Sequence, residues 1–190
     1  MTEVIEEGEF KSERVQQALR IAQEAHAGQF RRDGKTPYIE HPKAVGRILE
    51  MSGCDEDTII AGLLHDTIED TDLTLEQVKD VFGERVALLV DSVSEPPQST
   101  HSWKERKEHT LRTLKVAPKS AVMVVAADKA HNLRSLRTAL DSVGESMWMR
   151  FHGSKDLQKW YYEEMAKVIE MRLGQSPIID EIKEHIKHLF

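Results

Sequence analysis

The segment AGLLHDTIEDTD, residues 61 to 72, places one histidine and four acids within eight positions beside an apolar stretch. Its apolar and small residues have the spacing of the inward face of a helix: Ala61, Gly62, Leu63, Leu64 and Ile68. We expect one helix, capped by Asp55, to carry the whole segment. On such a helix His65 and Glu69 lie one turn apart. Asp66 and Asp70 have the same spacing, so the four polar side chains form a single edge.

A divalent metal is the economical explanation for this edge, because close acids repel one another unless a cation or protons offset their charge. The alternative is an ordinary helix face with solvated acids and one hydrogen-bonded histidine. Two residues elsewhere favour the metal. His41 directly precedes Pro42 at the start of an expected helix and can project into a cleft. Asp128 follows seven apolar residues, where a carboxylate is costly to bury unless it is paired or coordinates a cation.

Helical periodicity continues along most of the chain. Val15, Ala18, Leu19 and Ala22 recur at steps of three and four residues, which predicts an amphipathic helix over about residues 11–27. Further helices are expected over about 42–51, from 55 through the HDTIED segment, and over about 74–81, 84–93, 103–116, 118–140, 154–173 and 178–189. The valines of 121–127 also allow a strand, but the helical spacing of the residues that follow favours a helix. The predicted fold class is all-α.

Composition indicates one globular domain. The 190 residues are 39% hydrophobic and 31% charged, with only 6 Pro and 10 Gly. Cys54 is the only cysteine, which excludes an intramolecular disulfide and suits a reducing compartment. No apolar run approaches the roughly 18 residues that span a bilayer, and the acidic start MTEVIEEGEF is unlike a secretory signal. We therefore expect a cytoplasmic protein without a membrane partner. A net charge of −7 argues against binding to a nucleic-acid backbone but leaves room for a local basic pocket.

The order of the candidate ligands, His41, then His65 and Asp66, then Asp128, resembles the H…HD…D metal signature of HD-domain phosphohydrolases. Four longer segments sharpen the resemblance: AHAGQFRRDGKTPYIEHP (25–42), LLHDTIEDT (63–71), FGERVALLVDSV (82–93) and ADKAHNLRSL (127–136). In this order they resemble the hydrolase domain of RelA/SpoT homologues, which degrade the alarmone (p)ppGpp, and of their small single-domain relatives. The resemblance implies one HD-type helical bundle over residues 1–190, with a motif-bearing core at about 14–140 and a helical C-terminal extension at about 141–190.

The resemblance implies one divalent-metal site with four ligands: His41, His65, Asp66 and Asp128. Manganese is the metal that the family suggests, although two imidazoles and two carboxylates are also compatible with iron, zinc or magnesium. Glu69 and Asp70 match the family's acidic pair that orients and deprotonates the attacking water. The alternative for these two acids is solvation at a helix end. The other histidines, including His131, show no ligand spacing.

Groups suited to a phosphorylated substrate lie beside these motifs, because guanidinium groups match phosphate oxygens. The resemblance implies substrate-binding roles for Arg31, Arg32, Lys35, Tyr38, Lys129, Asn132 and Arg134. Asn132 looks like the family residue that contacts the nucleoside, and Tyr38 is expected to stack or pack beside it. The loop has one more residue before Pro37 than is usual in the family, which favours Arg31 over Arg32. Loop cations such as Lys35 are also often ordinary surface residues.

The implied function is that of a guanosine-3′,5′-bis(diphosphate) 3′-pyrophosphohydrolase of the stringent response, which converts ppGpp to GDP and pyrophosphate. The alternatives are a phosphatase that removes a ribose monophosphate, for example from NADPH, and a nucleotide-sensing module without turnover. Two segments depart from the long enzymes and leave the substrate open: 94–110, whose Lys104, Arg106 and Lys107 could close over a substrate, and 146–165. The aromatic residues of the second segment are expected to build core or the surface of a homo-oligomer.

Overall fold

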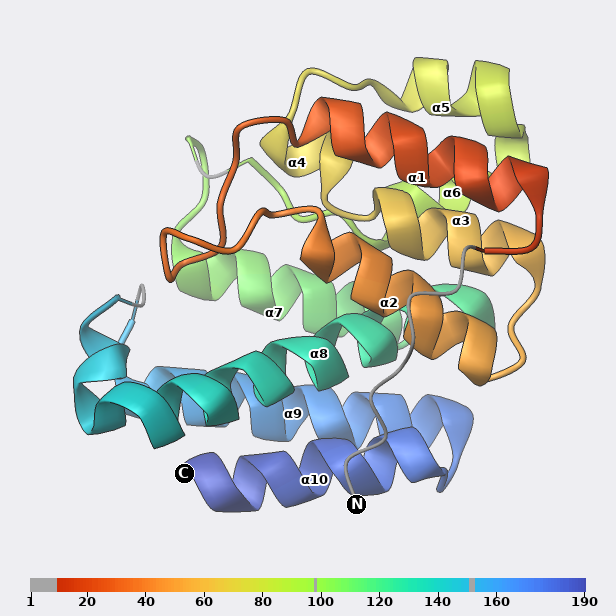
Figure 1. Ribbon diagram of the computed structural model, residues 1–190. Coiled ribbons are helices and arrows are strands. Elements are labelled where there is room, and N and C mark those ends of the chain that lie inside the picture. The colour runs from red at the N-terminus through yellow and green to blue at the C-terminus, as the bar shows by residue number, and fades with distance from the viewer. Residues whose placement is uncertain (1–9, 98, 151–152) are drawn as a thin grey trace.

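The computed structural model describes residues 10–97, 99–150 and 153–190, which form a bundle of helices (Figure 1). The helices are α1 (Glu13–Ala25), α2 (Glu40–Met51), α3 (Glu56–Leu64), α4 (Thr67–Asp70), α5 (Leu75–Phe82), α6 (Glu84–Val93), α7 (Trp103–Leu114), α8 (Lys119–Val143), α9 (Lys155–Leu173) and α10 (Pro177–Leu189), with a 3-10 helix η1 (Gly144–Arg150) after α8. Within the described ranges the only β-pairing is an isolated bridge between Phe30 and Pro37. The all-α prediction is confirmed.

Most helix starts follow from local side-chain chemistry. Ser12 and Asp55 cap α1 and α3 by accepting hydrogen bonds from backbone N–H groups. Thr74 and Gln77 form a capping box that opens α5. α8 begins after Pro118 and runs through residues 121–127 as helix, so the preference for helix over strand there is confirmed.

The prediction of one continuous helix through residues 61–72 is wrong. α3 ends at Leu64, and the short helix α4 begins at Thr67. The Thr67 hydroxyl donates to the Leu64 carbonyl at 2.7 Å, and His65 Nδ1 donates to the Gly62 carbonyl at 2.8 Å. These side chains occupy carbonyl oxygens that a regular helix offers to backbone N–H groups, which favours a break there. His65 and Asp66 therefore lie at the junction of two helices.

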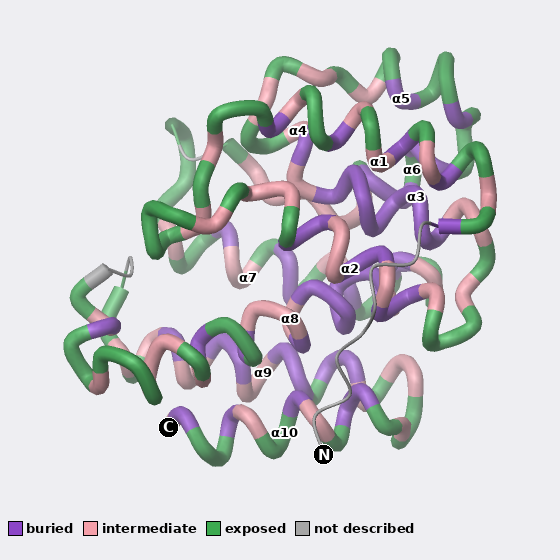
Figure 2. Tube along the Cα trace, viewed as in Figure 1, coloured by how far each residue is buried: buried purple, intermediate pink, exposed green. Residues whose placement is uncertain are grey.

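The helix α8 lies across the middle of the bundle (Figure 1). α9 and α10 pack along one side of it, while α2, α3 and α6 contact it from the other. Figure 2 shows how deeply α3 is embedded: every residue from Thr58 to Leu64 is buried. Because α3 and α8 both run through the core, they bring the HD segment and Asp128 together near its centre.

The helices α2 and α3 pack closely because a glycine on each helix faces a leucine on the other. A Cβ on Gly62 would collide with Leu49, and one on Gly46 would lie 2.9 Å from Leu63. We expect Gly62→Ala to lower the free energy of unfolding by about 1–3 kcal/mol, because Leu49 is itself fully buried and has little room to move. Chemical denaturation measures this loss; an unchanged or higher midpoint would contradict the close approach.

The acidic start of the chain, on which the expectation about a secretory signal depends, falls in residues 1–9 and lies outside the described residues. Among the residues that the structure describes, no helix combines the length and the apolar character needed to cross a membrane.

Candidate metal centre and its cavity

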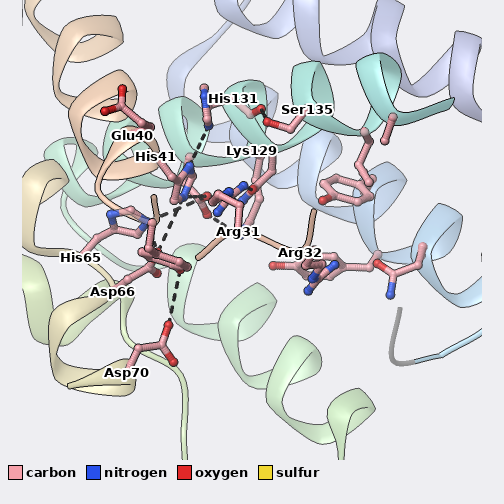
Figure 3. Close-up of a pocket in the computed structure, with 18 of the residues that line it drawn as sticks. Arg31, Arg32, Glu40, His41, His65, Asp66, Asp70, Lys129, His131 and Ser135 are labelled. Carbon is pink, nitrogen blue, oxygen red and sulfur yellow. Dashed lines mark hydrogen bonds and ion pairs between the residues drawn. The ribbon is translucent and has the colours of Figure 1, made fainter. Parts of the chain in front are cut away.

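His41, His65 and Asp66 point toward one another (Figure 3), and Asp128 of α8 lies against both histidines. His41 is the second residue of α2, His65 and Asp66 join α3 to α4, and Asp128 lies within α8. His41 Nε2 lies 3.2 Å from Asp128 Oδ1 and 3.6 Å from Asp66 Oδ2. His65 Nε2 lies 3.2 Å from Asp66 Oδ2 and 3.9 Å from Asp128 Oδ1. The tertiary structure thus brings together all four residues predicted as metal ligands.

The donor set fits a divalent cation. His65 Nδ1 donates to the Gly62 carbonyl, so in a neutral His65 the Nε2 lone pair is directed at the carboxylates and lies 3.2 Å from Asp66 Oδ2. His41, His65 and Asp66 each offer a ligand atom within 4.8 Å of the others. Asp128 adds a carboxylate that Lys129 and Asn132 also contact. Two nitrogens and two carboxylates suit manganese, iron or zinc.

The pKa shifts of His65 and Asp66 also indicate that the cluster favours positive charge. Burial lowers the pKa of His65, but the carboxylates of Asp66 and Asp128 and the Gly62 carbonyl together outweigh it and raise that pKa to about 9. Burial opposes ionisation of Asp66, yet His65 and His41 lower the pKa of its carboxyl well below the usual range. A bound cation would satisfy the same carboxylates and compete with protons for the imidazoles.

Tyr38 supports this cluster from the loop before α2. Its hydroxyl donates to Asp66 Oδ2 at 2.6 Å and lies 3.4 Å from Asp70 Oδ2. The ring packs on His26 with a centroid distance of 4.6 Å. Burial and the negative charge of Asp66 raise the pKa of Tyr38, so the hydroxyl remains a donor. The structure therefore places Tyr38 against the acids of the cluster, and Tyr38 also lines the cavity described below.

The two candidate catalytic acids lie on α4, next to the cluster. Glu69 Oε1 accepts a hydrogen bond from the backbone N–H of Glu95 at 2.8 Å. Loss of hydration within the cavity raises the pKa of Glu69 to about 7, and the negative charge of Asp66 adds to this effect. Loss of hydration and Asp66 also raise the pKa of Asp70. Both acids are in contact with solvent and line the same cavity as the four candidate ligands.

The cluster opens into a cavity of about 930 Å³ between α2, α7, α8 and α9. Cations and aromatic rings line it together: Arg31, Arg32, Tyr38, Trp103, Arg106, Lys107, Lys129, Tyr161 and Tyr162. The Lys107 ammonium lies 5.0 Å from the centroid of the Tyr161 ring and the Lys129 ammonium 5.7 Å from it. A cavity of this size accommodates a nucleotide, with charge for phosphates and flat surfaces for a base.

Of the seven residues predicted to bind substrate, five lie at this cavity: Arg31, Arg32, Tyr38, Lys129 and Asn132. Arg31 Nη2 donates to Asn132 Oδ1 at 2.8 Å, which joins the loop to α8. The Lys129 ammonium pairs with Asp128, which raises the pKa of Lys129 well above its usual range against the opposing effect of burial.

Two of the predicted substrate-binding residues lie elsewhere. Lys35 is exposed at the loop tip and does not line the cavity. Arg134 forms an ion pair with Glu181 of α10 through two nitrogens and does not line the cavity either. Its position follows from helix geometry: Arg134 is six residues beyond Asp128, which is a rotation of about 240° around α8.

Sequence reasoning missed the roles of three groups. His131 contacts His41, Glu95 holds Glu69, and Tyr161, which is buried in the core as expected, also lines the cavity. Only His131 had a usable signal, because residues three apart share a helix face and it follows Asp128 by three. Glu95 and Tyr161 reach the site through tertiary packing alone.

Comparison with known proteins supports the same family. The HD domain model matches residues 18–150. Over 174 residues the chain is 37% identical to guanosine-3′,5′-bis(diphosphate) 3′-pyrophosphohydrolase of Aquifex aeolicus, covering 91% of this chain but 23% of that protein. The crystal structure of lmo0812 from Listeria monocytogenes has 38% identity and a TM-score of 0.72, covering 79% of this chain and 98% of that one.

A second solved structure, described as a metazoan ortholog of SpoT that hydrolyzes ppGpp, has 26% identity and a TM-score of 0.79, and the match covers 95% of this chain and 98% of that one. The match to the HD domain model extends over more than half of the chain and contains all four candidate ligands. The chain therefore belongs to the HD-domain family.

Proposed function

We propose that the protein is a metal-dependent phosphohydrolase of nucleotides, with ppGpp as substrate and GDP and pyrophosphate as products. The observation that carries this proposal is the convergence of His41, His65, Asp66 and Asp128 beside two acids of raised pKa, in a cavity lined by cations. Relatives named for ppGpp hydrolysis support the substrate, although the chain spans only 23% of the Aquifex protein. The core at about 14–140 and the extension at about 141–190 act as one hydrolase domain in this proposal.

The four ligands would hold one divalent ion, which we propose to be Mn²⁺. When bound, the metal supplies a Lewis acid that polarises a phosphoryl oxygen and favours ionisation of water. Glu69 and Asp70 orient the attacking water and accept its proton. Glu95 holds the Glu69 carboxylate through its backbone N–H, and Tyr38 steadies Asp70. Water attacks the phosphorus attached to the ribose 3′-oxygen and the bond between these two atoms breaks. The 3′-oxygen leaves and takes up a proton, which gives GDP, and the phosphorus that gained the water oxygen is released in pyrophosphate.

The remaining groups would bind the nucleotide. Arg31 and Asn132 are joined by a hydrogen bond beside the candidate centre and form one edge of the binding site. Lys107 and Lys129 lie against the aromatic ring of Tyr161, which gives the cavity both charge and a flat surface there. Diphosphates on both sides of a ribose need such charge at two separate places. We propose that the enzyme acts on this nucleotide in the cytoplasm.

The protein with Mn²⁺ should release pyrophosphate from ppGpp and bind ppGpp better than GDP. We expect Arg31→Ala and Arg32→Ala to raise KM more than they lower kcat, because each removes a charge-assisted contact worth about 1.5–3 kcal/mol, or roughly 10–150-fold in affinity. Steady-state kinetics with separate assays of phosphate and pyrophosphate provides the measurement.

Lys35→Ala is the matched control for this prediction. It removes a cation from the same loop but outside the cavity, so KM should stay at the wild-type value. Release of orthophosphate from NADPH with ppGpp untouched would replace the proposed substrate with a ribose monophosphate. Tight binding of ppGpp without any product would instead favour a sensing module.

A further inference from the structure

His131 contacts a candidate ligand through its ring. It lies on α8, three residues after Asp128, and is half-buried at the cavity wall. Its Nδ1 is 2.7 Å from His41 Nδ1, and the two ring centroids are 4.9 Å apart (Figure 3). A separation of 2.7 Å between two ring nitrogens is a hydrogen bond, so one nitrogen carries a proton and the other accepts it.

The location of that proton determines what the opposite side of His41 can do. His41 Nε2 faces Asp128 and Asp66 at 3.2 and 3.6 Å. For Nε2 to offer a lone pair to a cation, the proton of a neutral His41 must lie on Nδ1. His41 Nδ1 then donates, and His131 Nδ1 accepts.

In the opposite tautomer both ring nitrogens of His41 also have hydrogen-bond partners. A proton on His41 Nε2 is donated to Asp128 Oδ1, and His131 Nδ1–H then donates to His41 Nδ1. In this tautomer His41 directs a proton, not a lone pair, at the cluster. His65 has no such choice, because its Nδ1 faces the Gly62 carbonyl, which can only accept. The cluster thus combines one imidazole of fixed tautomer with one whose tautomer depends on its neighbour.

We infer that His131 is a positioning residue for the candidate metal centre: its Nδ1 accepts the His41 Nδ1–H and so keeps His41 Nε2 available to a divalent cation. This inference rests on the proposed function, because it assumes that His41 is a ligand. Residues that hydrogen-bond a ligating histidine typically contribute 10–100-fold to metal affinity. An imidazole in this position is unusual, since carboxylates and carbonyls are the common acceptors.

Two substitutions at position 131 distinguish the effect of losing the hydrogen-bond acceptor from the effect of changing the size of the side chain. His131→Leu removes the acceptor and leaves His41 Nδ1–H unpaired in a buried place, so we expect Mn²⁺ to bind about 10–100-fold more weakly. His131→Asn keeps an acceptor, because the amide oxygen is attached at Cγ as the imidazole Nδ1 is, and affinity should remain within about threefold of wild type. Titration followed by the electron paramagnetic resonance of free Mn²⁺ measures both constants.

The proton itself provides a second readout. In the Co²⁺-loaded protein, the N–H of each ligating histidine gives a shifted proton signal that disappears in D₂O. Wild type and His131→Asn should show such a signal for both His41 and His65. In His131→Leu the His41 signal should be lost through fast exchange while the His65 signal remains. A loss of fold would remove both signals.

The controls distinguish the inference from the proposed function. His188→Leu removes a histidine of α10 that is 42% exposed, and metal affinity should not change. If wild type binds no Mn²⁺, the proposed metal centre itself fails. If wild type binds Mn²⁺ and His131→Leu binds it equally well, or His131→Asn is as weak as His131→Leu, the metal centre stands and the role of His131 is refuted.

Discussion

Replacing His65 with alanine should abolish stoichiometric binding of a divalent metal and, with it, hydrolysis. His65 is buried and its Nε2 lies 3.2 Å from Asp66 Oδ2, so the substitution removes one of the two nitrogen donors of the candidate site. Asp128→Ala should have the same effect, because it removes the carboxylate that lies 3.2 Å from His41 Nε2. Both losses of affinity should exceed the roughly 10–100-fold typical of a residue that only supports a ligand. Elemental analysis after gel filtration measures the metal content.

His109→Ala is the control for these ligand variants. It removes an exposed histidine of α7, so any metal bound adventitiously by surface imidazoles would decrease while the site stays intact. Circular dichroism must show that each variant remains helical. A folded His65→Ala or Asp128→Ala protein that keeps a full equivalent of metal would refute the ligand assignment.

Glu69→Gln and Asp70→Asn should each lower kcat by about a hundredfold or more while the metal stays bound. Each change replaces a proton acceptor with an amide of similar size, so geometry is preserved and basicity is lost. Neither residue is among the four candidate ligands, and metal content should therefore equal that of wild type. Single-turnover assays at saturating substrate isolate this step from product release. Turnover near the wild-type rate in both variants would show that the two acids are solvated surface residues without a catalytic role.

The pH dependence of kcat provides an independent check on Glu69. Its pKa is raised to about 7, chiefly by loss of hydration, and only the deprotonated carboxylate can accept a proton from water. Activity should therefore be low below pH 7 and rise as pH increases through this pKa; positive charge from a bound cation would move the midpoint to lower pH. Asp70→Asn should keep this rising limb, whereas Glu69→Gln should lose it.

Local patterns in the sequence were sufficient for the helices. Capping by Ser12 or Asp55 and the Thr74–Gln77 box act within a few residues, so they can be read without knowing the fold. The break after Leu64 could not be read in this way. It depends on two side chains that bond to nearby carbonyls in competition with the backbone, and apolar spacing alone carries no sign of that competition.

Part of the candidate site could likewise be predicted from the sequence, and part of it depends on tertiary structure. The spacing within HDTIED and the cost of burying Asp128 after seven apolar residues indicated a metal. The resemblance to HD-domain phosphohydrolases then implied the four ligands and the acidic pair beside them. The structure places the four ligand atoms together because α2, α3 and α8 pack against one another.

Which cations reach the cavity was decided by tertiary structure alone. Lys35 and Arg134 had the right charge and the right neighbours in sequence, yet one lies at a loop tip and the other pairs with Glu181. Lys107 and Tyr161 come from helices far along the chain and contact each other at the cavity wall. The direction of a side chain depends on the rotation of its helix and on the packing of its partners, and charge at a sequence position determines neither.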